Sequence, residues 1–264
     1  MAQFHVITGA DERIAVPTVR TIGIDDLKIA LTKGLDDFLA MPSHVVFISL
    51  IYPIIGLLLA RATLDNDLMP LLYPLAAGFA LIGPVAAIGL YEMSRRRERG
   101  LPVEWKHAFD IVRSPSMPAI AALAILLTII FLVWVTTAHQ IYQSLMGVAA
   151  AKGVTQFVDD VFTTRAGLTL IVVGNGVGFL FALGVLVISV VSFPMLVDRD
   201  VGAAVAVATS IMAVLTNPVT MAVWGLIIAA ALLVGSLPFF VGLAVVVPVL
   251  GHASWHLYRR VVAW

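Results

Sequence analysis

The chain has 264 residues, of which 61% are hydrophobic and 12% are charged. A soluble domain has roughly 45–50% apolar and about 25% charged residues, so this composition excludes a water-soluble globular protein. The 16 basic residues equal the 16 acidic residues in number, and this balance lacks the electrostatic footprint of a nucleic-acid-binding protein. The absence of cysteine excludes disulfides, iron–sulfur clusters and thiolate zinc sites.

Six apolar segments are long enough, or nearly so, to cross a membrane. The hydrocarbon core is about 30 Å thick, and a helix needs about 20 residues to span it. We therefore expect an all-α integral membrane fold of about six transmembrane helices. The sequence Gly-Ser-Leu-Pro at 235–238 is interpreted as a tight turn between the last two. The expected spans are Ser43–Ala60, Met69–Glu92, Met117–Ala138, Leu168–Ser192, Val219–Gly235 and Leu237–His256.

The basic residues are distributed unequally across these spans. Thirteen of the 16 lie on one side, and only Arg61, Lys152 and Arg165 lie on the other. Because basic loops stay in the cytoplasm, we expect a multi-pass membrane protein with both termini cytoplasmic. Residues 1–20 lack the basic start and apolar core of a signal peptide and are expected to form a flexible leader. The remaining residues, 21–264, are expected to form a single membrane domain.

An amphipathic segment that ends near a proline precedes each pair of expected spans. The apolar spacing of these segments is typical of helices that lie in the membrane interface. The pattern predicts three similar units, at about 21–97, 98–199 and 200–264, each an interfacial helix followed by a two-span hairpin. The alternative is that amphipathic starts and basic ends are common to polytopic proteins. The segments are Ile24–Met41 before Pro42, Val103–Arg113 before Pro115, and Val201–Thr216 before Pro218.

Within the first amphipathic segment, the large apolar residues are assigned to one face. The charged residues are assigned elsewhere on the helix, and Asp37 is one of them. This assignment predicts that Asp37 is not part of the apolar face.

Three stretches carry a resemblance to a known family: Leu250–Arg260 (LGHASWHLYRR), Gly89–Arg97 (GLYEMSRRR) and Thr216-Asn217-Pro218. Over about Thr18–Val262 the chain resembles bacterial inner-membrane proteins grouped as domain-of-unknown-function family 2189. The resemblance implies a multi-span fold, and some members carry a provisional label as cytochrome c oxidase subunits or related proteins. The family has no defined catalytic residue, so the resemblance implies none here.

Histidines at one predicted membrane level form a candidate metal site. His252 and His256 are spaced i, i+4 and share one helical face, and His44 and His107 are predicted at the same depth. Imidazoles at this spacing suit a Zn, Cu or Ni ion, and four of them can also form a haem site. The alternative is an interfacial anchor that hydrogen-bonds lipid headgroups.

Two basic clusters and one glycine motif are further candidate sites. Basic clusters next to a span can bind anionic lipid headgroups or can merely enforce topology. In the fourth expected span, a G-x-x-x-G motif permits close helix approach, inside this chain or against a partner, and Asn175 can hydrogen-bond across that contact. The candidates are Arg95, Arg96, Arg97, Arg99, Arg259 and Arg260 for lipid headgroups, and Gly174, Asn175 and Gly178 for helix packing.

The expected spans have no Asp, Lys or Arg in their interior, and Glu92 lies at a span end. Ion-coupled carriers and proton pumps need such charges, so the pattern disfavours them. We expect a non-catalytic accessory, assembly or scaffold protein without a cofactor, whose partners are membrane lipids and, as the family resemblance implies, a respiratory membrane complex, with no nucleic acid. Two alternatives stay open: a carrier or channel for a small or lipidic solute, and a haem or metal protein through His252 and His256.

Overall fold

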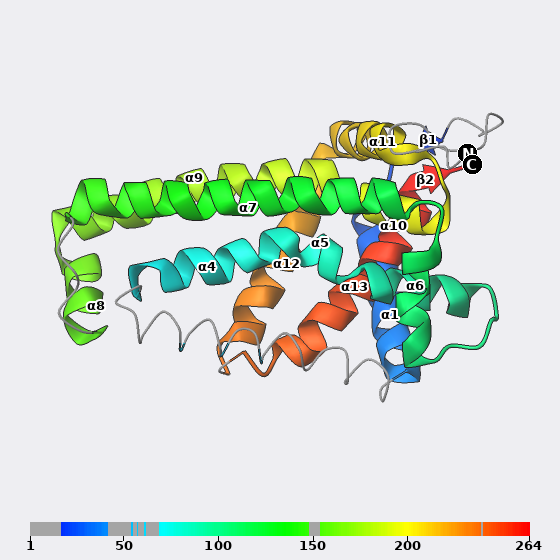
Figure 1. The fold of residues 1–264 in the computed structure, drawn as a ribbon, viewed down its shortest axis with the longest axis horizontal. Helices are drawn as coiled ribbons and strands as arrows, with labels where there is room; N and C mark the ends of the chain where they lie inside the picture. The colour runs from blue at the N-terminus through cyan, green and yellow to red at the C-terminus, as the bar shows by residue number, and fades with distance from the viewer. Residues whose placement is uncertain are drawn as a thin grey trace. The chain divides into compact units, whose positions relative to one another are not determined.

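The structure is a computed structural model that describes residues 17–41, 54, 57, 61, 69–147, 154–238 and 240–264. Its elements are helices apart from two short strands, β1 (Thr18–Val19) and β2 (Val262–Ala263), which confirms the all-α class (Figure 1). The helical elements are α1 (Ile24–Ala40), η1 (Met69–Leu71), α4 (Leu72–Phe79), η2 (Ala80–Ile82), α5 (Gly83–Ala86), α6 (Ile88–Glu98), η3 (Trp105–Arg113), α7 (Met117–Met146), α8 (Val154–Thr163), α9 (Arg165–Ser189), α10 (Ser192–Asp198), α11 (Gly202–Thr216), α12 (Pro218–Ser236) and α13 (Leu243–Val261).

Four helical segments in the described part of the chain are long and apolar enough to cross a membrane. They overlap the second to fifth expected spans, and three of them extend well beyond the expected ends. Apart from residues 54 and 57, the first expected span, Ser43–Ala60, lies outside the described residues, as does Pro42. The chain is therefore a multi-pass membrane protein, and the number six stays a prediction. The four segments are Leu72–Glu98, Met117–Met146, Arg165–Asp198 and Pro218–Ser236.

The turn between α12 and α13 is longer than the expected Gly-Ser-Leu-Pro turn. Helix α12 ends at Ser236 and α13 begins only at Leu243, six residues after the expected start at Leu237. Two glycines close the turn, because a Cβ atom on Gly242 would lie 2.7 Å from the carbonyl oxygen of Gly235. Phe240 takes a φ of 64° inside the turn. The sixth expected span is thus replaced by a helix that starts later and continues past His256 to Val261.

The three predicted interfacial segments are helical in the structure. Helices α1 and α11 begin and end within one residue of the predicted bounds. The second segment differs, because η3 is a 3-10 helix rather than an α-helix. The arrangement of three equivalent units stays a prediction.

The chain forms two compact units, and the three predicted units stay a prediction. The first consists of Met1–Pro53, Gly83–Ile125 and Leu186–Trp264, and the second of Ile54–Ile82 and Leu126–Val185. Within the second unit, Trp134 of α7 joins the neighbouring helices. Its indole nitrogen donates a hydrogen bond to the carbonyl oxygen of Pro74 at 2.8 Å, and its ring centroid lies 5.5 Å from that of Phe181.

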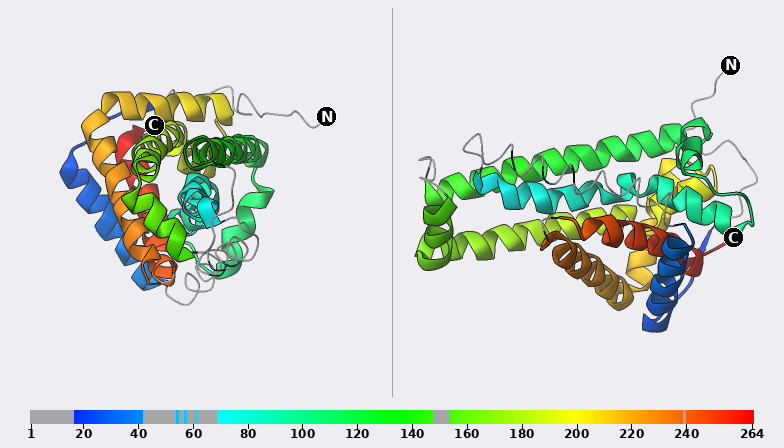
Figure 2. Two further views of the ribbon diagram at one scale, coloured as in Figure 1. Left: turned by 90° about the vertical axis from the view of Figure 1, so that its left-hand side faces the viewer. Right: turned by 90° about the horizontal axis from the view of Figure 1, so that it is seen from below.

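The core of the first unit lies where α1 packs against α13, and Figure 2 shows α1 (blue) next to the helices α12 and α13 (orange to red). A Cβ atom on Gly34 would lie 2.6 Å from the backbone nitrogen of Ala253, so only glycine fits there. The buried residues of α1 are Leu27, Ala30, Gly34 and Asp37. The predicted apolar face is wrong in part, because Leu35 and Leu39 are exposed. The close helix contact selects small side chains instead.

Both ends of the described chain meet in the short sheet. Strand β1 pairs with β2 in antiparallel register, with Thr18 opposite Ala263 and Val19 opposite Val262. The side chain of Asn217 extends this contact, since its amide donates to the carbonyl oxygen of Arg20 at 3.0 Å and accepts from the Ile22 nitrogen at 2.7 Å. The segment that leads into α1 is thereby fixed against the end of α13 and the corner between α11 and α12.

The contact between α1 and α13 gives a first prediction. We expect Gly34→Val to lower the free energy of unfolding by about 2–3 kcal/mol, because its side chain must push the two backbones apart. Thermal unfolding in mild detergent measures the effect. Gly184→Ala in α9 is the control, since a Cβ atom there meets nothing within 4 Å. Equal melting temperatures for Gly34→Val and the unmodified protein would contradict this packing.

Candidate functional site

The carboxylate of Asp37 is the centre of a buried polar cluster in the first unit. Its side chain is buried, and it accepts hydrogen bonds at Oδ2 from Ser94 Oγ at 2.5 Å and from His256 Nε2 at 2.9 Å. The guanidinium group of Arg97 forms an ion pair with the other oxygen, Oδ1. Both carboxylate oxygens are therefore satisfied by donors from other helices.

His252 completes the cluster on the far side of Ser94. Its Nδ1 lies 2.7 Å from Ser94 Oγ and 3.9 Å from Asp37 Oδ2, and the imidazole is fully buried. The other ring nitrogen, Nε2, is also buried and has no hydrogen-bond partner among the described residues. The order Asp37, Ser94, His252 thus forms a short hydrogen-bonded chain in the protein interior.

Helical spacing explains why these side chains meet. Ser94 and Arg97 lie three residues apart on α6, and His252 and His256 lie four residues apart on α13, so each pair shares a helical face. Both faces meet α1 at Asp37. The sequence predicted that the two histidines share a face, and it did not predict their partner.

Asp37 is the site residue that the sequence interpretation missed. Its prediction as a charged residue outside the buried face is wrong, because it lies in line with Ala30 and Gly34 on the face that contacts α13. That alignment is the signal that was available, since positions 30, 34 and 37 follow the i, i+4, i+7 spacing of one face. Charge alone assigned the residue to the other side.

The electrostatics of the cluster favour the ionised form of Asp37. Burial raises the pKa of this carboxyl group, but hydrogen bonds from His256, Ser94 and Arg97 lower it by more. The net pKa lies below the ordinary value of 3.8. Asp37 is therefore a carboxylate at neutral pH, held by three donors.

The structure brings together only two of the four histidines predicted as metal ligands. His107 lies in η3, where its Nδ1 accepts a hydrogen bond from the backbone nitrogen of Glu104 at 2.9 Å and caps that helix. His44 lies outside the described residues. In the described ranges, no three His, Asp or Glu side chains are arranged to hold a metal ion. Metal or haem binding stays a prediction.

The six arginines predicted to bind lipid headgroups have partners inside the chain. Besides its ion pair, Arg95 donates a hydrogen bond to the carbonyl oxygen of Val197 at 2.9 Å, and this bond joins α6 to α10. These ion pairs neutralise much of the charge of both basic clusters, and lipid binding by them stays a prediction. The ion pairs are Arg95 with Glu92 at 2.7 Å, Arg96 with Asp110 at 3.3 Å, Arg97 with Asp37, Arg99 with Asp198 at 2.9 Å, Arg259 with Glu98 at 3.2 Å, and Arg260 with Asp26.

The glycine motif of α9 lies in the second unit. A Cβ atom on Gly178 would lie 2.9 Å from the ring of Trp134, so this glycine faces α7. Gly174 meets nothing within 4 Å. Between them, Asn175 accepts a hydrogen bond from the Tyr73 hydroxyl at 2.6 Å, which links α9 to α4. Gly178 and Asn175 thus make contacts inside this chain, and Gly174 is open among the described residues.

Residues 72–198 match the sequence model of a family described as a predicted integral membrane protein, DUF2189. This is the family that the sequence resembles. The match covers α4 to α10 and includes the motif at 89–97, whereas the motifs at 216–218 and 250–260 lie beyond it. Searches of curated proteins and of solved structures gave no match. The DUF2189 description supports a membrane protein and names no activity.

The buried cluster gives a second prediction, based on two adjacent aspartates of α1. Asp37→Asn is expected to lower the free energy of unfolding by about 2–4 kcal/mol, because the buried donors lose their charged acceptor. The matched control is Asp36→Asn, which removes the same charge from an exposed position one residue earlier. Thermal unfolding in detergent compares the two variants. Equal losses for Asp36→Asn and Asp37→Asn would show that the cluster does not stabilise the fold.

The same carboxylate gives a third prediction, for the pH dependence of stability. The pKa of Asp37 is lower in the folded protein than in the unfolded chain. Its contribution to the free energy of unfolding is therefore complete above the pKa of the unfolded state, and it is lost as the pH falls through the pKa of the folded state. We therefore expect the difference in melting temperature between the unmodified protein and Asp37→Asn to be constant above roughly pH 5 and to narrow below roughly pH 4. A difference that persists unchanged at the acidic end contradicts the lowered pKa.

Proposed function

We propose that this chain is a non-catalytic accessory or scaffold protein of the bacterial inner membrane. The observation that carries the proposal is the burial of its chemically reactive side chains. Asp37, Ser94 and His252 are at most 2% exposed, and Ser94 bonds to both of the others. A catalytic or transport site needs such groups to reach a solute. The cluster instead joins three helices.

The exposed surface of the spanning helices is apolar, which supports a role in contacts within the membrane. On α9, Val172 is 73% exposed and Phe179 is 64% exposed. Gly176 lies four residues after Val172 on the same face, and a Cβ atom there would meet nothing within 4 Å, so another helix can approach closely. A membrane partner can therefore pack against α9 without displacing a side chain of the described chain.

The proposed partner and the proposed orientation in the membrane are supported by the sequence. The provisional oxidase label of some similar family members supports a respiratory membrane complex as the partner. The excess of basic residues on one side of the expected spans supports cytoplasmic termini. The carrier and the haem or metal protein remain alternatives, and no specific contact in the described residues favours either over the scaffold.

Photo-crosslinking in native membranes tests the proposal. A photoreactive residue at Val172 is expected to form an adduct with one defined membrane protein, because this position is exposed at the helix surface. A photoreactive residue at Phe181, whose ring packs against Trp134, is the control and is expected to form none. Mass spectrometry identifies the adduct.

The proposal also predicts co-purification at the endogenous expression level in mild detergent. If Val172 crosslinks only to lipid and the chain is purified alone, the accessory role is contradicted.

A further inference from the structure

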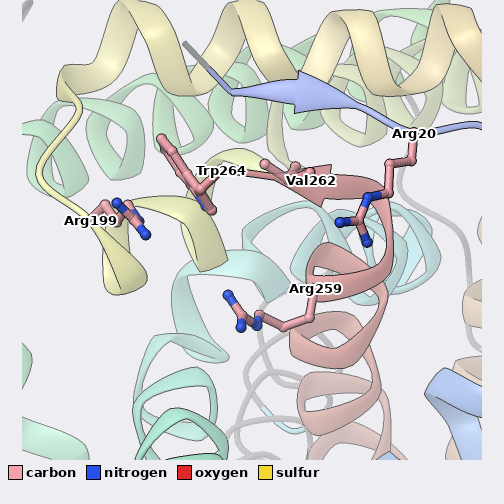
Figure 3. A pocket seen from close by; sticks show the side chains of 6 residues that line it. Arg20, Arg199, Arg259, Val262 and Trp264 are labelled. Atoms are coloured by element: carbon pink, nitrogen blue, oxygen red, sulfur yellow. The ribbon is translucent and has the colours of Figure 1, made fainter. Parts of the chain in front are cut away.

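A cavity of about 270 Å³ lies in the first unit beside strand β2. Arg20 follows strand β1, Arg199 follows helix α10, and Arg259 lies in the last turn of α13. Figure 3 shows these arginines around the cavity, with Val262 and Trp264 between them. Its lining residues are Arg20, Arg199, Arg259, Val262, Ala263 and Trp264. Half of them are arginines, and none has a side-chain carboxylate.

The backbone around the cavity is held by contacts between distant parts of the chain. The nitrogen of Arg20 donates to the carbonyl oxygen of Val261 at 2.7 Å, and the Tyr258 hydroxyl of α13 donates to Asp198, the last residue of α10, at 2.9 Å. The indole nitrogen of Trp264 donates to the Tyr258 hydroxyl at 3.0 Å. The three segments are therefore fixed relative to one another.

Among the described residues, two of the three guanidinium groups form no ion pair with a side-chain carboxylate. Arg199 lies over the ring of Trp264, 4.4 Å from its centroid. In the part of the chain that the structure describes, no carboxylate forms an ion pair with Arg20 or Arg199. Asp200, which follows Arg199 in the sequence, does not line the cavity.

The third arginine does not remove the positive charge. Arg259 pairs with Glu98 at 3.2 Å and with Asp198 at 3.4 Å, and Asp198 also pairs with Arg99 at 2.9 Å. Glu98 and Asp198 thus pair with Arg259 and Arg99, and within the described ranges no side-chain carboxylate neutralises Arg20 or Arg199.

We propose that this cavity binds a phosphate group, carried by an anionic phospholipid or by a soluble phosphate. Guanidinium groups present paired N–H donors that match the oxygens of a phosphate. Arg199 directly follows the spanning segment Arg165–Asp198, which puts the cavity at the membrane boundary where lipid phosphates lie. The proposal uses Arg20 and Arg199, which lie outside both basic clusters, and it does not depend on the accessory function.

The test uses the full-length protein in an uncharged detergent with two probes. Native mass spectrometry compares binding of phosphatidylglycerol with binding of phosphatidylcholine. Thermal unfolding compares inorganic phosphate with chloride at equal ionic strength. We expect the unmodified protein to prefer phosphatidylglycerol or to be stabilised by phosphate. Preference in the first assay identifies a lipid as the source, and stabilisation in the second identifies a soluble phosphate.

Variants assign the effect to the cavity. The double variant Arg20→Gln/Arg199→Gln is expected to bind about 100-fold more weakly, since each lost charged contact costs roughly tenfold. Arg113→Gln, an exposed arginine on η3 that does not line the cavity, is expected to bind normally. The proposal is overturned if the unmodified protein shows neither preference, or if Arg113→Gln weakens binding as much as the double variant does.

Discussion

The buried carboxylate of Asp37 constrains how the helices of the first unit pack against one another. Removing an ionised group from water costs several kcal/mol unless hydrogen bonds and opposite charge replace the lost solvation. Asp37 receives that replacement from Ser94, Arg97 and His256, which come from two other helices. Helices α1, α6 and α13 must therefore adopt one register. The close approach at Gly34 and Ala253 makes that register sterically possible.

The arrangement of α1, α6 and α13 also determines which carboxylates pair with the neighbouring arginines. Arginines that leave α6 and α13 pair with carboxylates of α6, α10, α1 and η3. Apart from Arg95–Glu92 within α6, these ion pairs join different segments, and they involve the basic residues that were expected to bind lipid headgroups. In the described part of the chain, the lining arginines Arg20 and Arg199 form no ion pair with a side-chain carboxylate, which is why the proposed phosphate site is placed there.

The spanning helices were predictable because they follow from local composition. About 20 apolar residues form a helix in lipid whatever their neighbours are, since the backbone must satisfy its own hydrogen bonds. The segments around α7, α9 and α12 were therefore found from the sequence. The end of the segment Leu72–Glu98 was less accurate, because the helix continues past Glu92 to Glu98, whose carboxylate accepts a hydrogen bond from Trp255, a partner that a hydropathy pattern does not contain.

Of the candidate site, the sequence predicted the pair of histidines and missed the aspartate that they surround. His252 and His256 share a face by spacing alone, so their proximity was expected. Asp37 was missed because charge normally indicates exposure, and its donors lie 57 to 219 residues away in the sequence. The turn before α13 was misplaced for a similar reason, since it depends on the contact between Gly235 and Gly242. Long-range contacts of this kind leave no periodic pattern.

A double-mutant cycle between Asp37 and His256 tests the central claim most directly. The free energy of unfolding is measured in detergent for the unmodified protein, Asp37→Ala, His256→Ala and the double variant. If the carboxylate holds α1 to α13 through this histidine, the two losses are non-additive, with a coupling energy of about 1–3 kcal/mol. Additive losses, with coupling below about 0.3 kcal/mol, would contradict the account.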